Sequence, residues 1–339
     1  MPSFIVLGKK NNSDAFQFDY NEQSQSGTLI NLTEQDQIPE NYNFIRFTED
    51  IVSFYLLSDI WIKNMNTNTV NKVESYFEST NGELAYLTTN SEDRIFTVYL
   101  KSSQSNDLYV RSRNISNSSI DDTLLGQANN VSNILYFQNH LIVSYNYFDG
   151  QERKYYVTVL NTTTNAIIKT IEFTEDIRYV TTSYSGDLVL GYSPDRLLFD
   201  IKSYRLNTME LINEYSPNTF FFGVIEGQYN QGIIYYQSPF AQPSPISYLP
   251  ATYNLDNNIA NNINILPALD NYAQKDEILR VSHINNIFDY ERNTLIVSTT
   301  ITYEDFTNKV GVFLFDLNGN LLNNVVIDED FIPNYVFLR

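Results

Sequence analysis

The sequence predicts an all-β fold, and two observations support this fold class. First, short runs of alternating apolar and polar residues recur along the 339-residue chain, separated by clusters of Asn, Asp, Gly and Ser. The stretch from Tyr155 to Tyr192 shows this rhythm most clearly, with the turn-like run Asn161-Thr-Thr-Thr-Asn165 between two alternating segments. Second, Tyr (26) and Phe (22) are abundant whereas Gly (12) is scarce, and aromatic side chains suit a half-buried sheet surface. Short strands joined by such turns are typical of antiparallel sheets.

In chain order, the alternating runs group into units of four strands. The first unit comprises 44–48, 51–57, 60–65 and 70–76. The second comprises 83–89, 95–101 and 108–113, with a weak first strand near Phe77. The third comprises 133–137, 141–147, 155–160 and 166–173, and the fourth 178–183, 188–192, 197–204 and 209–215. The fifth comprises 220–226, 232–237, 246–254 and a last strand within 257–266. The sixth comprises 279–284, 295–303, 310–316 and 321–327.

The two ends of the chain supply the strands that remain. Three predicted strands lie at the N-terminus (4–8, 15–20 and 27–32) and one lies at the C-terminus (335–339). The segments 36–47 and 330–339 both contain Ile-Pro, then Asn-Tyr, then an apolar strand with an arginine, and their separation fits repeats of the 40–50 residues typical of four-stranded blades. Pairing of the two ends would complete a seventh sheet and remove open edges. We therefore predict a single domain over residues 1–339, a seven-bladed β-propeller of four-stranded antiparallel blades, with six or eight blades as alternatives.

One blade carries a family resemblance. The run from Val157 to Ile171, followed by Tyr179-Val-Thr-Thr-Ser183, resembles the YVTN repeat of surface-layer-type and YncE-like seven-bladed propellers. Those repeats carry an aspartate where Asn161 stands, and Tyr-Val-Thr-Asn where this chain has Tyr-Val-Thr-Thr. The match covers this blade well and residues 312–326 loosely. The resemblance implies a propeller, commonly exported, with a binding role rather than chemistry.

Composition and charge exclude several classes of function. The chain has 21 basic and 40 acidic residues, a net charge of −19, which disfavours nucleic-acid binding because phosphate backbones are repelled. The absence of cysteine removes disulfides and thiolate sites, and no apolar run approaches the length of a membrane span. No leader is visible at the N-terminus. We expect an exported monomer, located in the periplasm or at the cell surface. One form of this expectation is a lipoprotein whose leader has been removed. The alternative is a cytoplasmic location.

The motif search finds no catalytic signature. Histidine occurs twice, at His140, which we expect to be exposed in a turn, and at His283, near the end of a predicted first strand where ligand contact is conceivable. The run Asp316-Leu-Asn-Gly-Asn320 fails the calcium-loop pattern and predicts a hairpin turn. Acidic pairs, such as Asp121-Asp122, are expected in solvated loops. We expect no metal and no cofactor.

The binding candidates are basic and aromatic. Four arginines fall within predicted first strands, which line the centre of a propeller, and their guanidinium groups could converge on an anionic ligand or instead pair with acids of neighbouring blades. These arginines are Arg46, Arg178, Arg280 and Arg339.

Three aromatic residues complete the candidate set. Trp61, the one tryptophan, lies beside a predicted turn and is either a stacking platform or a core residue. Phe240 lies within the Pro-rich insertion 238–245, and Tyr248 follows it. The insertion is longer than a hairpin turn needs, and it is our preferred candidate for a loop that contacts a ligand or partner.

We therefore predict a non-enzymatic binding or scaffold propeller that holds a small ligand, glycan or protein at the channel mouth or loop face. The alternatives are a carbohydrate-active hydrolase or lyase, with acids such as Glu175 or Glu226, and a purely structural assembly module.

Overall fold

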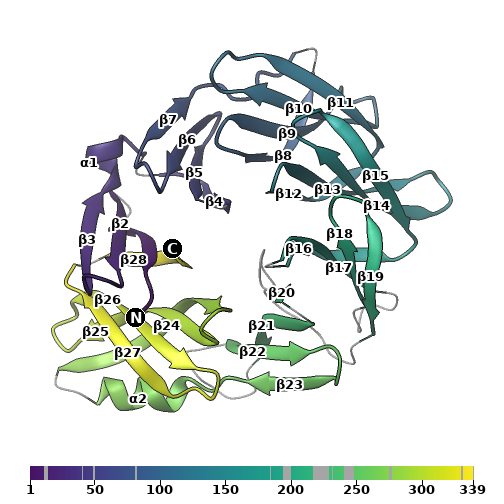
Figure 1. The fold of residues 1–339 in the computed structure, drawn as a ribbon. Coiled ribbons are helices and arrows are strands. Elements are labelled where there is room, and N and C mark those ends of the chain that lie inside the picture. The colour runs from purple at the N-terminus through teal and green to yellow at the C-terminus, as the bar shows by residue number, and fades with distance from the viewer. Residues whose placement is uncertain are drawn as a thin grey trace. The chain divides into compact units, whose positions relative to one another are not determined.

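The chain folds into seven four-stranded antiparallel sheets, and the fold is an all-β seven-bladed propeller (Figure 1). The structure is a computed structural model. It describes residues 1–339 except 11–13, 40, 49, 81, 184, 194–199, 217–228, 231, 240–247, 275–276, 330 and 339. In the described part no helix has the length and hydrophobicity to cross a bilayer. The chain forms two compact units: unit 1 is Met1–Tyr42, Ile233–Asn254 and Ile259–Arg339, and unit 2 is Asn43–Gly232 and Leu255–Asn258.

Unit 2 contains four complete sheets whose strands follow the chain order. The first is β4 (Phe44–Thr48), β5 (Ile51–Leu56), β6 (Asp59–Asn64) and β7 (Val70–Val73). The second is β8 (Leu84–Asn90), β9 (Arg94–Leu100), β10 (Asp107–Asn114) and β11 (Ile120–Gln127). The third is β12 (Asn130–Phe137), β13 (His140–Phe148), β14 (Arg153–Asn161) and β15 (Ala166–Phe173). The fourth is β16 (Asp176–Thr182), β17 (Asp187–Ser193), β18 (Asp200–Arg205) and β19 (Glu210–Tyr215).

The remaining sheets belong mainly to unit 1. One is β24 (Ile278–Asp289), β25 (Thr294–Tyr303), β26 (Asn308–Asp316) and β27 (Leu321–Ile327). Another is β20 (Tyr229–Asn230), β21 (Ile233–Pro239), β22 (Tyr248–Asn254) and β23 (Ile259–Asn262). The terminal sheet has the order β28 (Ile332–Leu338), β1 (Phe4–Lys10), β2 (Asp14–Asn21) and β3 (Ser26–Asn31). The short helices α1 (Leu32–Asp36) and α2 (Leu266–Ala273), which the alternation pattern did not predict, follow β3 and β23.

The terminal sheet confirms the predicted pairing of the two chain ends. Strand β28 lies antiparallel to β1, with Phe4 opposite Leu338 and Leu7 opposite Tyr335. A register shift follows Leu7, where a Cβ on Gly8 would overlap the carbonyl oxygen of Ile332. Glycine is therefore required at this close approach of two backbones. Pairing of the last strand with the first leaves the sheet with one strand from the C-terminus and three from the N-terminus, as the sequence predicted.

Burial explains why the middle strands are so apolar. Strands β9 and β13 are buried along almost their whole length, because the middle strands of a blade are covered on both faces. In unit 2 the core between the second and third sheets includes Phe96, Val98, Leu141 and Val143. The last strand of each sheet covers the core on one side, and most residues of β15 remain exposed.

A recurrent turn joins the third and fourth strands of several sheets. In it, an Asn or Asp side-chain oxygen accepts backbone N–H groups two to four residues later, an Asx turn. After Asn161, for example, Oδ1 accepts the N–H groups of Thr163 and Thr164 at 2.9 and 3.1 Å, and Asn165 has φ 54°. The same arrangement recurs at Asn21, Asn64, Asn114 and Asp316. In the predicted turn at Asn318-Gly319, Gly319 has the positive φ, 84°.

The second predicted unit is wrong in two places. Its first strand is β8 rather than a segment near Phe77, and its fourth strand, β11, was not predicted at all. Strand β11 carries the acidic pair Asp121-Asp122, and the register of β10 against it shifts after Leu108, so the alternation of side chains is broken. The predicted first strand of the fifth unit, 220–226, lies outside the described residues.

Candidate functional site

The four arginines predicted to converge lie in strands of both units or outside the described residues. Arg46 lies half-buried in β4 and Arg178 lies in β16, both in unit 2, but the Arg178 side chain is outside the described set. Arg280 lies exposed in β24 of unit 1, and Arg339 is outside the described residues. Arg46 acts electrostatically on Tyr55: burial raises the pKa of the Tyr55 hydroxyl, and the nearby guanidinium partly offsets this rise. Binding of an anion by the four arginines together stays a prediction.

The other candidates divide into one described side chain and three outside the described set. Trp61 lies in β6 with 7% of its surface exposed, and Lys72 Nζ sits 5.2 Å from the centre of its ring. This burial agrees with the core alternative rather than with an open stacking platform. Phe240 lies outside the described residues. Tyr248 and His283 lie in β22 and β24, but their side chains are not described.

His140 is a correction to the sequence prediction. We expected an exposed turn residue, but His140 begins β13 and only 7% of its surface is exposed. Its Nδ1 lies 2.7 Å from the carbonyl oxygen of Gln138. The ring thus has a buried structural contact at the turn, which tight pairing of β12 and β13 brings about.

The acidic pair Asp121-Asp122 is a second correction, because it lies in β11 and not in a solvated loop. Asp122 and Glu83 each form a two-pronged ion pair with Arg111, whose guanidinium nitrogens lie 2.9–3.0 Å from the carboxylate oxygens. The guanidinium carbon also lies 4.6 Å from the ring centre of Tyr99 and 5.1 Å from that of Phe77. Both partners of the arginine are thus already engaged, so this cluster is structural.

A pocket of about 390 Å³ in unit 2 is the candidate functional site. It is formed where three neighbouring sheets present the turns after their first and third strands. The turn after β4, the turn after β6, the turn after β8 and the end of β12 all contribute. The lining residues are Asp50, Ile51, Asn64, Asn66, Ser91, Glu92, Asp93 and Tyr136.

Asn64 shapes one wall of the pocket with both ends of its amide. Its Oδ1 accepts the N–H groups of Asn66 and Thr67 at 2.9 and 3.0 Å, which fixes the turn after β6. Its Nδ2 donates to Glu92 Oε1 at 2.8 Å. The repeated Asx turn therefore also orients a carboxylate that belongs to the next sheet.

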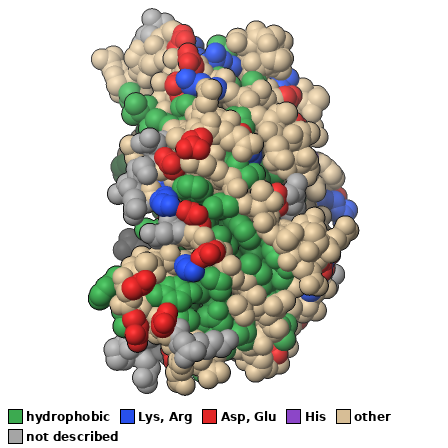
Figure 2. Space-filling view, turned by 90° about the vertical axis from the view of Figure 1, so that its left-hand side faces the viewer, with side chains coloured by type: hydrophobic (Ala, Val, Ile, Leu, Met, Phe, Trp, Pro, Cys, Tyr) green, Lys and Arg blue, Asp and Glu red, His purple; other side chains and the backbone are tan. Residues whose placement is uncertain are grey.

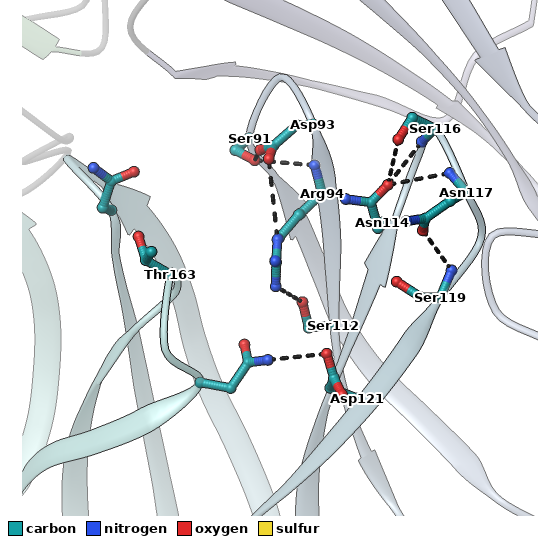
Figure 3. Close-up of polar contacts among 12 residues, drawn as sticks. Ser91, Asp93, Arg94, Ser112, Asn114, Ser116, Asn117, Ser119, Asp121 and Thr163 are labelled. Carbon is teal, nitrogen blue, oxygen red and sulfur yellow. Dashed lines mark hydrogen bonds and ion pairs between the residues drawn. The ribbon is translucent and has the colours of Figure 1, made fainter.

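The opposite wall is the turn between β8 and β9, which Figure 3 shows in close-up. Ser91 Oγ donates to Asp93 Oδ1 at 2.7 Å and accepts the N–H of Arg94 at 3.1 Å (Figure 3). The Arg94 side chain turns to Ser112, donating from Nη1 to its Oγ at 3.3 Å, and its Nε is 4.0 Å from Asp93 Oδ2. The carboxylate of Asp93 is thus oriented by one hydrogen bond, its side chain is 72% exposed, and Arg94 compensates its charge only at the limit of an ion pair.

Aromatic residues make the pocket rigid. Tyr136 is 7% exposed, stacks on Phe96 with ring centres 5.7 Å apart, and donates from its hydroxyl to Asn139 Oδ1 at 3.3 Å. Behind the Ser91 turn, the buried Tyr55 hydroxyl donates to Asn90 Oδ1 at 2.7 Å. Packed and hydrogen-bonded aromatic side chains have little freedom, so this part of the pocket is rigid, whereas Glu92 and Asp93 are exposed and each is oriented by one side-chain hydrogen bond.

The carboxylates of the pocket offer hydrogen-bond acceptors to a ligand. Three carboxylates line it, and within the described part of the chain neither Asp50 nor Glu92 forms an ion pair with a Lys or Arg. Across the described residues, no group of three or more His, Cys, Asp or Glu side chains is arranged to hold a metal ion. A fixed, negatively charged pocket can bind a cationic or hydrogen-bond-donating group.

Several carboxyl groups elsewhere in the described part of the chain have a lowered pKa. Hydrogen bonds from Lys202 and Tyr192 lower the pKa of Glu214, and backbone N–H groups lower the pKa of Asp149. A hydrogen bond from Thr307 lowers that of Asp305. A general acid in glycoside hydrolysis requires the opposite shift.

Sequence reasoning did not find this pocket. Its residues come from turns that are far apart in the chain, and each turn taken alone resembles an ordinary solvated loop. One signal was available: an Asn or Asp followed four residues later by a residue suited to a positive φ recurs after several third strands, as in Asn64 to Asn68 and Asn161 to Asn165. Aligning the repeats on that Asn would have placed Asn64 beside the first turn of the following blade.

Comparison with known proteins identifies the fold and no family. No protein-family model matches the sequence, and no curated protein matches it. An apocarotenoid oxygenase from Synechocystis is structurally similar with a TM-score of 0.52 and 7% identity, over 100% of this chain and 92% of that one. Dipeptidyl peptidase 4 from Porphyromonas gingivalis has a TM-score of 0.49 and 13% identity, over 94% of this chain, which spans 48% of the peptidase. At these identities the likeness concerns the propeller fold alone.

Proposed function

We propose that this protein is a non-enzymatic binding propeller whose turn-lined pocket in unit 2 receives a positively charged group of a ligand or partner protein. The observation that carries the proposal is that Glu92 and Asp93, both exposed at a pocket of about 390 Å³, are each oriented by a hydrogen bond from a neighbouring Asn or Ser side chain. The net charge of −19 adds long-range attraction for cations. The resemblance to YVTN-type propellers supports both a binding role and a location outside the cytoplasm, which cell fractionation would test.

Binding of short peptides tests the proposal. A dye-labelled peptide rich in arginine should bind the whole protein saturably by fluorescence anisotropy, whereas the same peptide with glutamate in place of arginine should not. Glu92→Gln should weaken binding about tenfold, since a hydrogen bond to a charged group contributes about 1.5–3 kcal/mol. Glu210→Gln is the matched control, because Glu210 lies in β19, away from the pocket, with 67% of its side chain exposed. Equal binding of both peptides, or an unchanged affinity in Glu92→Gln, would refute the proposal that the pocket binds a positively charged group.

The enzyme alternative has its own experiment. A glycan-cleavage screen with the same protein should show no turnover. Cleavage that a single pocket change such as Asp93→Asn abolishes would replace the binding proposal with the carbohydrate-active one.

A further inference from the structure

Unit 1 contains a second and larger groove, of about 590 Å³, between the last strands of two neighbouring sheets. One wall is the beginning of β3, from Gln25 to Gly27, and the other is β27 with Asp328. Most of its exposed lining is polar, and the largely buried side chains of Phe18 and Ile327 lie beneath it. In the lower half of Figure 2, where these strands lie, hydrophobic side chains gather beside acidic ones.

Gly27 keeps the groove open over its aromatic floor. A Cβ at this position would overlap the ring of Phe18, so any larger residue would displace that ring. Phe18 in turn packs near Phe4, with ring centres 6.2 Å apart. The floor is therefore anchored to the core of the terminal sheet and does not depend on a ligand for its shape.

The two strands that flank the groove are unprotected sheet edges. β3 and β27 are each the last strand of their sheet, and neither contains a charged residue or a proline. Four other last strands carry charges, which normally prevent unwanted pairing: Lys72 in β7, Asp121 and Asp122 in β11, Lys169 and Glu172 in β15, and Glu210 and Glu214 in β19. The short last strand β23 is also uncharged, but no groove of this size adjoins it among the described cavities. Uncharged edges and a groove of this size occur together at β3 and β27.

Two acidic side chains stand at the groove, and both are paired with cations. Glu22 and Asp328 line it, and each already forms one ion pair, with Arg292 at 2.9 Å and with Lys309. The Asp328 side chain is 86% exposed, and a carboxylate accepts up to about four hydrogen bonds, so both acids can contact a further cation. A second copy of this chain, at −19, would be repelled, and so would an anionic surface.

We propose that this groove is a docking site for an extended segment of a basic partner protein, which pairs with the open edge of β27. Backbone hydrogen bonds along the strand supply affinity, as in other cases where a peptide adds to a sheet edge. Apolar side chains of the segment contact Val325 and Met1 at the groove, and basic ones reach Glu22 and Asp328. The groove lies in the other unit from the pocket described above, so the two proposals stand or fall separately.

Hydrogen exchange and peptide titration test this docking site. A short peptide of alternating lysine and valine, added to the full chain, should slow amide exchange in residues 321–327, because newly paired N–H groups exchange slowly. Asn323 is exposed and lines the groove, so Asn323→Lys should lower the affinity about tenfold through like-charge repulsion. Asn213→Lys is the matched control, since Asn213 is exposed on β19, outside the groove. Asp328→Asn, at an exposed position, should weaken binding without affecting folding.

Several outcomes would overturn the proposal. These are equal binding of a glutamate–valine peptide, protection of another strand instead of β27, or no binding of either peptide. A concentration-dependent dimer that Asn323→Lys dissociates would assign the groove to a second copy of the chain, and would also overturn it.

Discussion

Arg111 should be one of the most important single side chains for the stability of unit 2. It lies in β10 and forms ion pairs with Glu83, just before β8, and with Asp122 in β11. Its Nη1 also donates to the carbonyl oxygen of Glu78, and the neighbouring Arg113 donates to that of Ser75. The two arginines thereby hold the connection between β7 and β8 against the sheet. Arg111→Met keeps the length of the side chain and removes its charge.

Burial sets the magnitude of the expected loss. The side chains of Arg111 and Glu83 are 11% and 7% exposed, so the change would leave the Glu83 carboxylate buried without a cation. Breaking a buried pair in this way typically costs about 3–5 kcal/mol of unfolding free energy. The Asp122 side chain is 34% exposed and remains partly solvated, so loss of its ion pair adds little to the expected loss of stability. We expect a loss of about 3–4 kcal/mol, including the contacts of the guanidinium with Phe77 and Tyr99.

The same pair predicts a pH dependence. Burial raises the pKa of Glu83, but hydrogen bonds from Arg111 and Thr80 overcome this and hold the pKa below its ordinary 4.5. A carboxyl whose pKa is lower in the folded state stabilises the fold above the unfolded pKa and loses that contribution as pH falls through the folded value. Wild-type stability should therefore decline as the pH falls below about 4.5, and this part of the decline should be absent in Arg111→Met combined with Glu83→Gln.

Urea unfolding followed by circular dichroism measures these effects, and hydrogen exchange at residues 74–83 localises them. The triple variant Arg111→Met, Glu83→Gln, Asp122→Asn should recover most of the loss, because no buried charge is left unpaired. Arg205→Met serves as the control, since its ion pair with Glu210 is 62% and 67% exposed and should contribute under 1 kcal/mol. A loss below 1 kcal/mol in Arg111→Met, or a triple variant no more stable than the single one, would refute the reasoning.

Three further changes test other parts of the fold by the same unfolding assay. Asn161→Ala should lose about 1 kcal/mol, because two backbone N–H groups lose their acceptor, whereas Asn161→Asp should retain stability. Gln17→Met should raise the free energy of unfolding by about 1–2 kcal/mol. Gln17 is fully buried, and neither end of its amide has a hydrogen-bond partner among the described residues. An unchanged urea midpoint would contradict this prediction. Phe331→Ala should lower the free energy of unfolding by about 3–5 kcal/mol and increase hydrogen exchange in β28. Phe331 is 1% exposed and stacks on Phe16 with ring centres 6.0 Å apart. Unchanged protection of β28 would show that another contact holds the last strand.

Most strands were predictable because both the period and the turns pointed to them. β4, β15 and β27 have the predicted bounds, since each is an apolar-rich run between turn residues. The pairing of β28 with β1 was also predictable, because the C-terminal strand repeats a pattern seen near the N-terminus. In contrast, β11 escaped detection because Asp121 and Asp122 stand together in it; Asp122 pairs with Arg111 of the neighbouring strand, and Asp121 accepts a hydrogen bond from Asn165. A strand that owes its stability to a cross-strand ion pair leaves no hydrophobic period to read.

The candidate site was less predictable than the fold, since a pocket depends on which turns become neighbours. The arginines and aromatic residues stood out in the sequence because they are rare or conspicuous residue types. Glu92 did not, because it is one of 40 acidic residues, and only its hydrogen bond from Asn64 distinguishes it. Residue type alone is thus weak evidence where the composition is so acidic.

The repeated Asx turn links the fold to the proposed function. In each such turn the first Asn or Asp is occupied by backbone N–H groups, so the identity of that residue is fixed by folding. Asn66, which follows Asn64, bonds through its backbone N–H and lines the pocket, whereas Ser116 after Asn114 also donates from its hydroxyl to Asn114 Oδ1 (Figure 3). Folding therefore constrains Asn64 and leaves the side chain of Asn66 to the pocket. A variable side chain on a turn that folding fixes is the arrangement that the proposed binding role requires.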